Sequence, residues 1–272
     1  MSTEDRFPIA FGERLRSLLI LVLLPLALIQ WLPLATFTFT VQLPGFYLAQ
    51  PISLRAGVTL IVAGLAAAGM DWLIRSHPLA KGNTFPHLLF PFLTTLALGG
   101  ILPFIPGGIL WWSAFLFGAV LLALVFTAEF ITLDSAAPFF PLASGGLTLL
   151  GVILFLLIAS SLRFVSMRLA LLLPTLGLVT FLLSLRLFRL YLPQRWELYW
   201  SLGLALLVLQ IAAPLHYWPL AVTPFGLMLA GSFYGLFSTA VALVEGNLSR
   251  WTVVEAVWIV LGSWGLALWL NR

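Results

Sequence analysis

Apolar residues fill most of this chain in long blocks, and the blocks end at charged residues or at clusters of proline and glycine. A helix needs ~20 mainly apolar residues to cross a bilayer, and blocks of about this length recur along the whole chain. Dividing the chain at these breaks predicts nine membrane-spanning helices. They cover roughly residues 17–35, 53–74, 87–105, 108–130, 144–162, 168–186, 196–213, 218–244 and 251–270.

Two of the predicted connections are short enough to change this number. The third and fourth blocks are separated only by the Pro-Phe-Ile-Pro-Gly-Gly run at 103–108, which is typical of a tight turn. The fifth and sixth blocks are separated by the stretch from Arg163 to Arg168. Eight helices would result if one of these pairs were a re-entrant element. The pattern therefore predicts an all-α fold, a polytopic transmembrane helix bundle of about nine helices, in one integral membrane domain over residues 1–272.

The N-terminal segment allows two interpretations. Residues 1–16 carry several charges and are predicted to form a short cytoplasmic tail. Arg14 and Arg16 before an apolar run also resemble the start of a signal peptide. The run is long, contains Pro25 and Pro33, and ends without a clear small-x-small cleavage pattern. We therefore expect a first helix that is retained.

The longest predicted connection, residues 36–52, has a pattern of its own. Apolar and polar residues alternate from Phe37 to Leu43, which is the signature of a strand. A lone strand cannot satisfy its backbone groups in lipid, so this segment should lie at the outer interface or pack over the bundle. We expect an interfacial loop anchored by Phe46 and Tyr47, and the alternative is a lid over an outward-facing cavity.

Composition strengthens the membrane assignment and excludes several functions. Hydrophobic residues make up 62% of the 272 residues and charged residues only 8%, whereas a soluble domain carries about 25% charged residues. Membrane lipids are thus the predicted partners of the exterior. The net charge of +4 does not indicate nucleic-acid binding, because the basic residues form no dense patch. The absence of cysteine excludes disulfides and cysteine-ligated metals.

Basic residues set the predicted orientation in the cell membrane, because cytoplasmic loops carry an excess of Lys and Arg. With nine helices and a cytoplasmic N-terminus, nine basic residues fall inside and four fall outside. The inner set is Arg6, Arg14, Arg16, Arg75, Lys81, Arg186, Arg189, Arg195 and Arg250, and the outer set is Arg55, Arg163, Arg168 and Arg272.

Candidate chemistry gathers at the predicted inner interface. Ionisable groups near a membrane span are costly and therefore informative, and five of them would lie at one depth: Asp71, His77, His87, Glu129 and Asp134. Glu129, Asp71 and His87 are the candidate catalytic residues, and His77, His87 and Asp134 are weak candidates for a metal site. The two histidines lack the i, i+4 spacing of a helical metal pair. The alternative is that polar loop residues gather where water is present.

Glu129 stands out because its sequence neighbours are largely apolar. A carboxylate one turn inside the hydrocarbon must take up a proton or find a partner. Arg186 and Arg189, near the end of the sixth block, are candidate partners, and with Glu129 they are the candidate ligand-binding residues. Such a pair would serve equally well as structural glue. Positive-inside anchoring also explains the two arginines, with an anionic headgroup site as the alternative.

Glycines in the eighth block suggest close helix packing. Gly231 and Gly235 form a GxxxG match, which in a multi-span chain usually meets an internal helix but can also hold a membrane-protein partner or a second copy. No motif for a cofactor or a phosphate loop is present, so no cofactor is predicted.

Three functions fit these observations. The first, which we favour, is binding or transport of a hydrophobic or lipid-like small molecule. The second is an accessory subunit of a larger membrane complex, and the third is a membrane-embedded enzyme that modifies a lipid or isoprenoid at the inner interface. The predicted spans have no midplane charge, which argues against ion coupling and favours an apolar ligand or a subunit role. Of the three functions we expect a non-enzymatic one.

Overall fold

A computed structural model describes residues 3–32, 35–43, 46–75, 84–134, 136, 138–192 and 197–272. In this part of the chain it contains nine α-helices, one 3₁₀ turn and one β-hairpin. Eight of the helices, α2 to α9, are long and apolar enough to cross a membrane. The predicted all-α polytopic bundle is confirmed, and the architecture fits a multi-pass membrane protein. The membrane concerned and the side of the N-terminus stay predictions.

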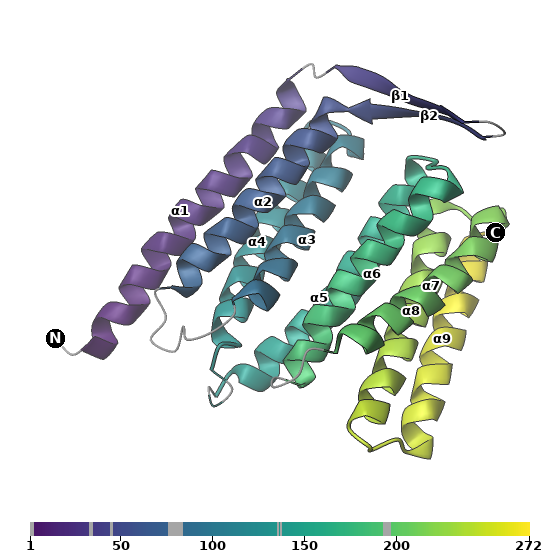
Figure 1. Ribbon diagram of the computed structural model, residues 1–272. Coiled ribbons are helices and arrows are strands. Elements are labelled where there is room, and N and C mark those ends of the chain that lie inside the picture. The colour runs from purple at the N-terminus through teal and green to yellow at the C-terminus, as the bar shows by residue number, and fades with distance from the viewer. Residues whose placement is uncertain are drawn as a thin grey trace. The chain divides into compact units, whose positions relative to one another are not determined.

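The contacts divide the chain into two compact units, unit 1 over Met1–Phe140 and unit 2 over Pro141–Arg272. Unit 1 carries the first four helices and the hairpin, and unit 2 carries the next five helices (Figure 1). Each unit is described by itself below. The prediction of one membrane domain over the whole chain stays a prediction.

Unit 1 packs three helices, α1, α2 and α4, around an apolar core. Its elements are α1 (Thr3–Trp31), β1 (Thr36–Leu43), β2 (Phe46–Ser53), α2 (Leu54–Ile74), α3 (Phe85–Ile101), the 3₁₀ turn η1 (Leu102–Phe104) and α4 (Ile109–Ile131). Leu18 and Val22 of α1, Met70 of α2 and Phe126 of α4 are fully or almost fully buried in one cluster. Because neighbouring helices run in opposite directions (Figure 1), the ends of α2 and α4 lie at the same end of the unit as the start of α3.

The first helix is longer than the sequence pattern predicts. It begins at Thr3, so most of the segment expected to be a tail is helical. Two side chains explain how a charged segment can continue the helix: the ring of Phe11 lies 4.4 Å from that of Phe130, and the Arg14 guanidinium lies 5.0 Å from the Trp72 ring centroid. Packing against α2 and α4 thus stabilises the helical conformation of the charged residues that precede the apolar block.

Among the described residues both short connections separate complete helices. Of these nine helices, eight have the length and composition of a membrane span, so the choice between eight and nine spans stays a prediction. Between α3 and α4 the chain turns through η1, and Gly108 adopts a φ of 97° just before α4, a conformation that favours glycine. Between α5 and α6, Ser166 takes a φ of 52° and Arg168 is extended before the next helix.

Strands β1 and β2 pair as an antiparallel hairpin, where the sequence pattern predicted a loop with one strand. Thr36 pairs with Ser53 and Leu43 with Phe46, and the Leu54 amide donates to the Ala35 carbonyl at 3.0 Å to close the base. The alternation from residue 37 did indicate a strand, and the second strand satisfies its backbone groups. The described β1 side chains, Phe37 among them, are exposed. The Phe46 and Tyr47 side chains lie outside the described part, and the lid stays a prediction.

Unit 2 is arranged around α8. Its helices are α5 (Phe140–Phe164), α6 (Leu169–Tyr191), α7 (Leu198–Tyr217), α8 (Val222–Val244) and α9 (Arg250–Leu270). Helix α8 packs against α6, α7 and α9, and against α5 through Phe155 and Phe233, whose ring centroids lie 4.8 Å apart. More than half of the apolar part of α8 is buried, whereas only 11% of the apolar part of α9 is. Helix α9 therefore has most of its surface available for lipid.

The GxxxG glycines of α8 meet an internal helix. A Cβ atom at Gly231 would overlap the Ser263 side chain of α9, and one at Gly235 would lie 2.7 Å from Val260 and 3.2 Å from the Ala256 carbonyl. The missing side chains are thus what allows α8 and α9 to pack closely. Because α9 occupies this face within unit 2, an interface to another protein through the same two glycines stays an untested prediction.

Candidate functional site

The candidate site lies at the end of unit 1 where α2 and α4 finish and α3 begins. We call it the polar end of unit 1 and define it by Asp71, Arg75, Thr84, His87 and Glu129. Its centre is a contact between two helices: the Nδ1 atom of His87 lies 2.8 Å from the Oε2 atom of Glu129. The Glu129 side chain is completely buried, and the His87 side chain is 15% exposed.

Local structure places both members of this pair. His87 stands in the first turn of α3, where its amide donates to the Thr84 carbonyl at 3.0 Å and Pro86 fits the start of the helix. Glu129 stands in the last turn of α4. The Thr132 hydroxyl donates to the Glu129 carbonyl at 3.0 Å, which satisfies one of the acceptors left open at a helix end.

A buried carboxylate in an apolar bundle needs such a partner. Removing an ionised carboxylate from water costs several kcal/mol even after relaxation. The hydrocarbon of a bilayer has no hydrogen-bond donor or positive charge to offset this cost. The imidazole meets this need either as a neutral hydrogen-bond partner or, when protonated, as a counter-charge. The pair is therefore able to hold a proton between two groups, only one of which reaches the surface of unit 1.

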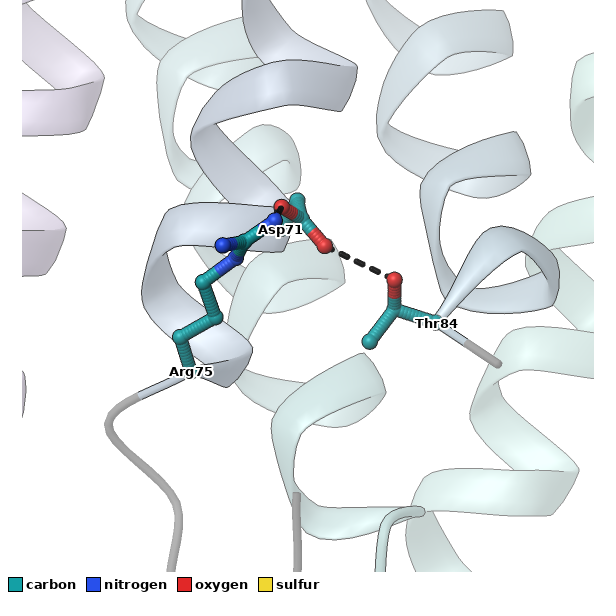
Figure 2. A network of polar contacts seen from close by, with 3 residues as sticks. All are labelled: Asp71, Arg75 and Thr84. Atoms are coloured by element: carbon teal, nitrogen blue, oxygen red, sulfur yellow. Dashed lines mark hydrogen bonds and ion pairs between the residues drawn. The ribbon is translucent and has the colours of Figure 1, made fainter. Parts of the chain in front are cut away.

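A second polar network joins Asp71 and Arg75, at the end of α2, to Thr84, which precedes α3 (Figure 2). The Oδ1 atom of Asp71 accepts a hydrogen bond of 2.7 Å from the Thr84 hydroxyl. Its Oδ2 atom is 2.7 Å from Nη2 and 2.8 Å from Nε of Arg75. The Thr84 contact ties the end of α2 to the start of α3. The arginine side chain is 75% exposed, so its ion pair contributes little to stability.

The structure thus brings three of the predicted site residues to one end of unit 1. Asp71 and His87 are linked through Thr84, and Glu129 contacts His87 directly. Asp134 serves its own loop, because its Oδ1 atom accepts from the Ala136 amide at 2.9 Å. His77 lies outside the described residues. Among those that are described, no group of three or more histidine and acidic side chains is arranged to hold a metal ion.

The predicted basic partners of Glu129 belong to the other unit. Arg186 of α6 is buried, with 2% of its surface exposed, and Arg189 is half-buried in the last turn of the same helix. Both stand in unit 2, whereas Glu129 stands in unit 1. A contact between them stays a prediction, whereas the contact of Glu129 with His87 lies within unit 1.

Sequence reasoning gave Arg163 no role beyond its side of the membrane. The structure shows its guanidinium donating three hydrogen bonds to the turn between α7 and α8: to the carbonyls of His216 at 2.9 Å, Trp218 at 3.1 Å and Leu220 at 3.3 Å. Asn271 holds the same turn from the end of α9, accepting from the Ala221 amide and donating to the Pro219 carbonyl. All five of these hydrogen-bond partners are backbone atoms, which leave no signal in a sequence.

Comparison with known proteins identifies the family but not a relative of established activity. No curated protein and no solved structure matches the chain. One family model, described as a protein of unknown function (DUF5656), matches residues 34–270. This match covers the hairpin and the helices from α2 to α9, including every residue of the polar end of unit 1. Because the match covers most of the chain, the protein belongs to the DUF5656 family.

Proposed function

We propose that this membrane protein binds a lipid-like small molecule, with an apolar tail and a polar head, at the polar end of unit 1. The observation that carries the proposal is the pair formed by His87 and Glu129. A carboxylate with no exposed surface is paired with an imidazole that keeps some exposure. The imidazole is then the group that meets the polar head of the ligand, while Glu129 fixes the orientation of its ring.

The surroundings suit an amphipathic ligand better than an ion. Leu88, Phe130 and Leu133 belong to or pack against the core cluster beside the pair, so a hydrocarbon tail would meet apolar side chains. Each of the described spans from α2 to α9 carries at most two Asp, Glu, Lys or Arg residues, which argues against a charged path for ions through these helices. Binding is therefore the simplest role, and movement of the bound molecule across the membrane would build on it.

One observation also favours a second candidate function, acid–base catalysis on a lipid. Histidine is the commonest general base, and a carboxylate on one ring nitrogen sets the tautomer and orientation of the other. The Nδ1 contact of 2.8 Å has this form. Binding and catalysis share the same pair and differ in their product: a bound ligand is recovered unchanged, and a substrate is recovered modified.

The decisive experiment is photolabelling of the detergent-purified protein with a long-chain fatty alcohol that carries a diazirine next to its polar head. We expect label in the peptides around His87 and Glu129, mapped by mass spectrometry. The paired replacement of His87→Leu and Glu129→Leu should abolish this label while the helical circular dichroism is kept. Replacing one buried polar pair by apolar residues of similar volume is usually tolerated.

A matched control removes the other carboxylate at this end. Asp71→Asn leaves the His87 contact in place and should keep most of the label. Equal labelling of the wild type and the double leucine variant would contradict the proposal. Recovery of a chemically altered alcohol from the wild type, but not from His87→Leu, would favour the enzyme.

A further inference from the structure

Outside the candidate site, a charged side chain with several hydrogen bonds to another part of unit 2 is Arg163, in the last turn of α5. Its guanidinium is held by the three carbonyls of the α7–α8 turn and lies 5.3 Å from the Phe225 ring centroid on α8. Contacts from two other helices and a turn therefore fix its position. A guanidinium carries five N–H groups, so three hydrogen bonds leave further donors for another acceptor.

The charge of Arg163 is not neutralised by these contacts, because carbonyl oxygens are neutral acceptors. In the part of unit 2 that the structure describes, all three acidic side chains lie at the other end of the helices: Glu197 before α7, Glu245 after α8 and Glu255 in the second turn of α9. The charged side chains at the end that holds Arg163 are all basic, with Arg168 before α6 and Arg272 after α9. This end of unit 2 thus has an excess of positive side chains.

Aromatic residues indicate the depth of this end in a membrane. Tyr217 is 76% exposed and Trp218 is 43% exposed, in the same turn that Arg163 holds. Exposed tyrosine and tryptophan side chains are enriched at the level of lipid headgroups. A fixed guanidinium at this level meets the phosphates of lipids, whose oxygens match its planar set of donors.

We propose that Arg163 and the α7–α8 turn form a binding site for the phosphate group of an anionic lipid headgroup. The count of basic residues predicts that this end faces the outer surface. The site is independent of the function proposed for unit 1, because it uses other residues in another unit. A soluble phosphate would offer the same chemistry, and the experiment below separates the two sources.

The test is native mass spectrometry of the full chain in neutral detergent, titrated with phosphatidylglycerol, with phosphatidylcholine or with inorganic phosphate. We expect phosphatidylglycerol to bind at least several-fold more tightly than phosphatidylcholine and inorganic phosphate to compete weakly. Arg163→Gln should weaken phosphatidylglycerol binding by about tenfold, the scale of one charge-assisted contact. Arg163→Lys should give an intermediate loss, because it keeps the charge without the planar set of donors.

The matched control is Asn271→Ala, which loosens the same turn without changing its charge. We expect its phosphatidylglycerol affinity to stay within about twofold of the wild type, because the guanidinium is intact. Equal weakening in Arg163→Gln and Asn271→Ala would overturn the proposal, since it would show that only the fold of the turn matters. Equal affinity of the wild type for both lipids would overturn it even if Arg163→Gln failed to fold. Tight binding of inorganic phosphate would assign the site to a soluble anion instead.

Discussion

The two units hold their helix ends together with polar side chains of different kinds. At the polar end of unit 1, side chains contact side chains: Glu129 meets His87, and Asp71 meets Thr84. At the α7–α8 turn of unit 2, Arg163 and Asn271 mainly contact backbone carbonyls and an amide. Backbone groups must be satisfied in any membrane protein, so the contacts of Arg163 and Asn271 with the turn meet a general structural need, and the phosphate site proposed for Arg163 would come in addition to it. No such general need explains a buried carboxylate, and the function proposed above rests on this difference.

The largest expected effect comes from breaking the buried pair on one side only. Glu129→Ala removes the carboxylate that contacts His87 and leaves a cavity in the core, which should lower the free energy of unfolding by about 3–5 kcal/mol. Unfolding in SDS, followed by tryptophan fluorescence, measures this change.

The double replacement of His87 and Glu129 by leucine tests whether the pair is kept for function or for stability. If the pair is kept for function, the double variant should regain most of the lost stability, because apolar residues of similar volume pack in its place. A double variant as unstable as Glu129→Ala would show that the pair is a structural need, and the contrast between the two units would disappear.

The next largest effect concerns Arg163. Arg163→Ala removes three hydrogen bonds from a charged donor, and we expect a loss of about 2–3 kcal/mol, since one such bond contributes about 1.5–3 kcal/mol and the effects do not add fully. The same SDS titration measures it. Asn271→Ala, which removes neutral hydrogen bonds from the same turn, should cost only about 1 kcal/mol. A smaller loss for Arg163→Ala than for Asn271→Ala would mean that the arginine does not hold the turn.

The sequence predicted the helices far better than their contacts, and particular residues show why. Block length alone indicated the helices, because span length follows from bilayer thickness. The start of α1 at Thr3 and the strand after residue 45 were missed, since packing by Phe11 and pairing with β1 decide them. Antiparallel neighbours placed Asp71, His87 and Glu129 at one end. Which of them touch depends on rotation about each helix axis, and helices that are apolar on every face give no pattern from which to read it.

Packing between α8 and α9 gives a smaller expected effect within unit 2. Gly231→Ala puts a methyl group onto the Ser263 side chain, and overpacking of this kind should cost about 1–3 kcal/mol. Gly262→Ala on α9 is the control, because no atom lies within 4 Å of its added Cβ, and it should be neutral or slightly stabilising. Adding Ser263→Gly to Gly231→Ala should restore part of the loss in thermal unfolding. Equal stability of the two alanine variants would show that close approach of these helices is not needed.

The smallest expected effect on stability compares two contacts of Asp71, the hydrogen bond from Thr84 and the ion pair with the exposed Arg75. Thr84→Val keeps the shape of the side chain but removes the hydroxyl that donates to Asp71, so we expect a loss of about 1 kcal/mol. Arg75→Gln breaks the ion pair on the other oxygen of the same carboxylate, where the arginine is 75% exposed, and should change stability by less than about 0.5 kcal/mol. Thermal unfolding in detergent would measure both. A larger loss of stability for Arg75→Gln than for Thr84→Val would mean that the exposed ion pair holds the end of α2. The hydrogen bond from Thr84 to Asp71 would then not be what positions the start of α3, and with it His87.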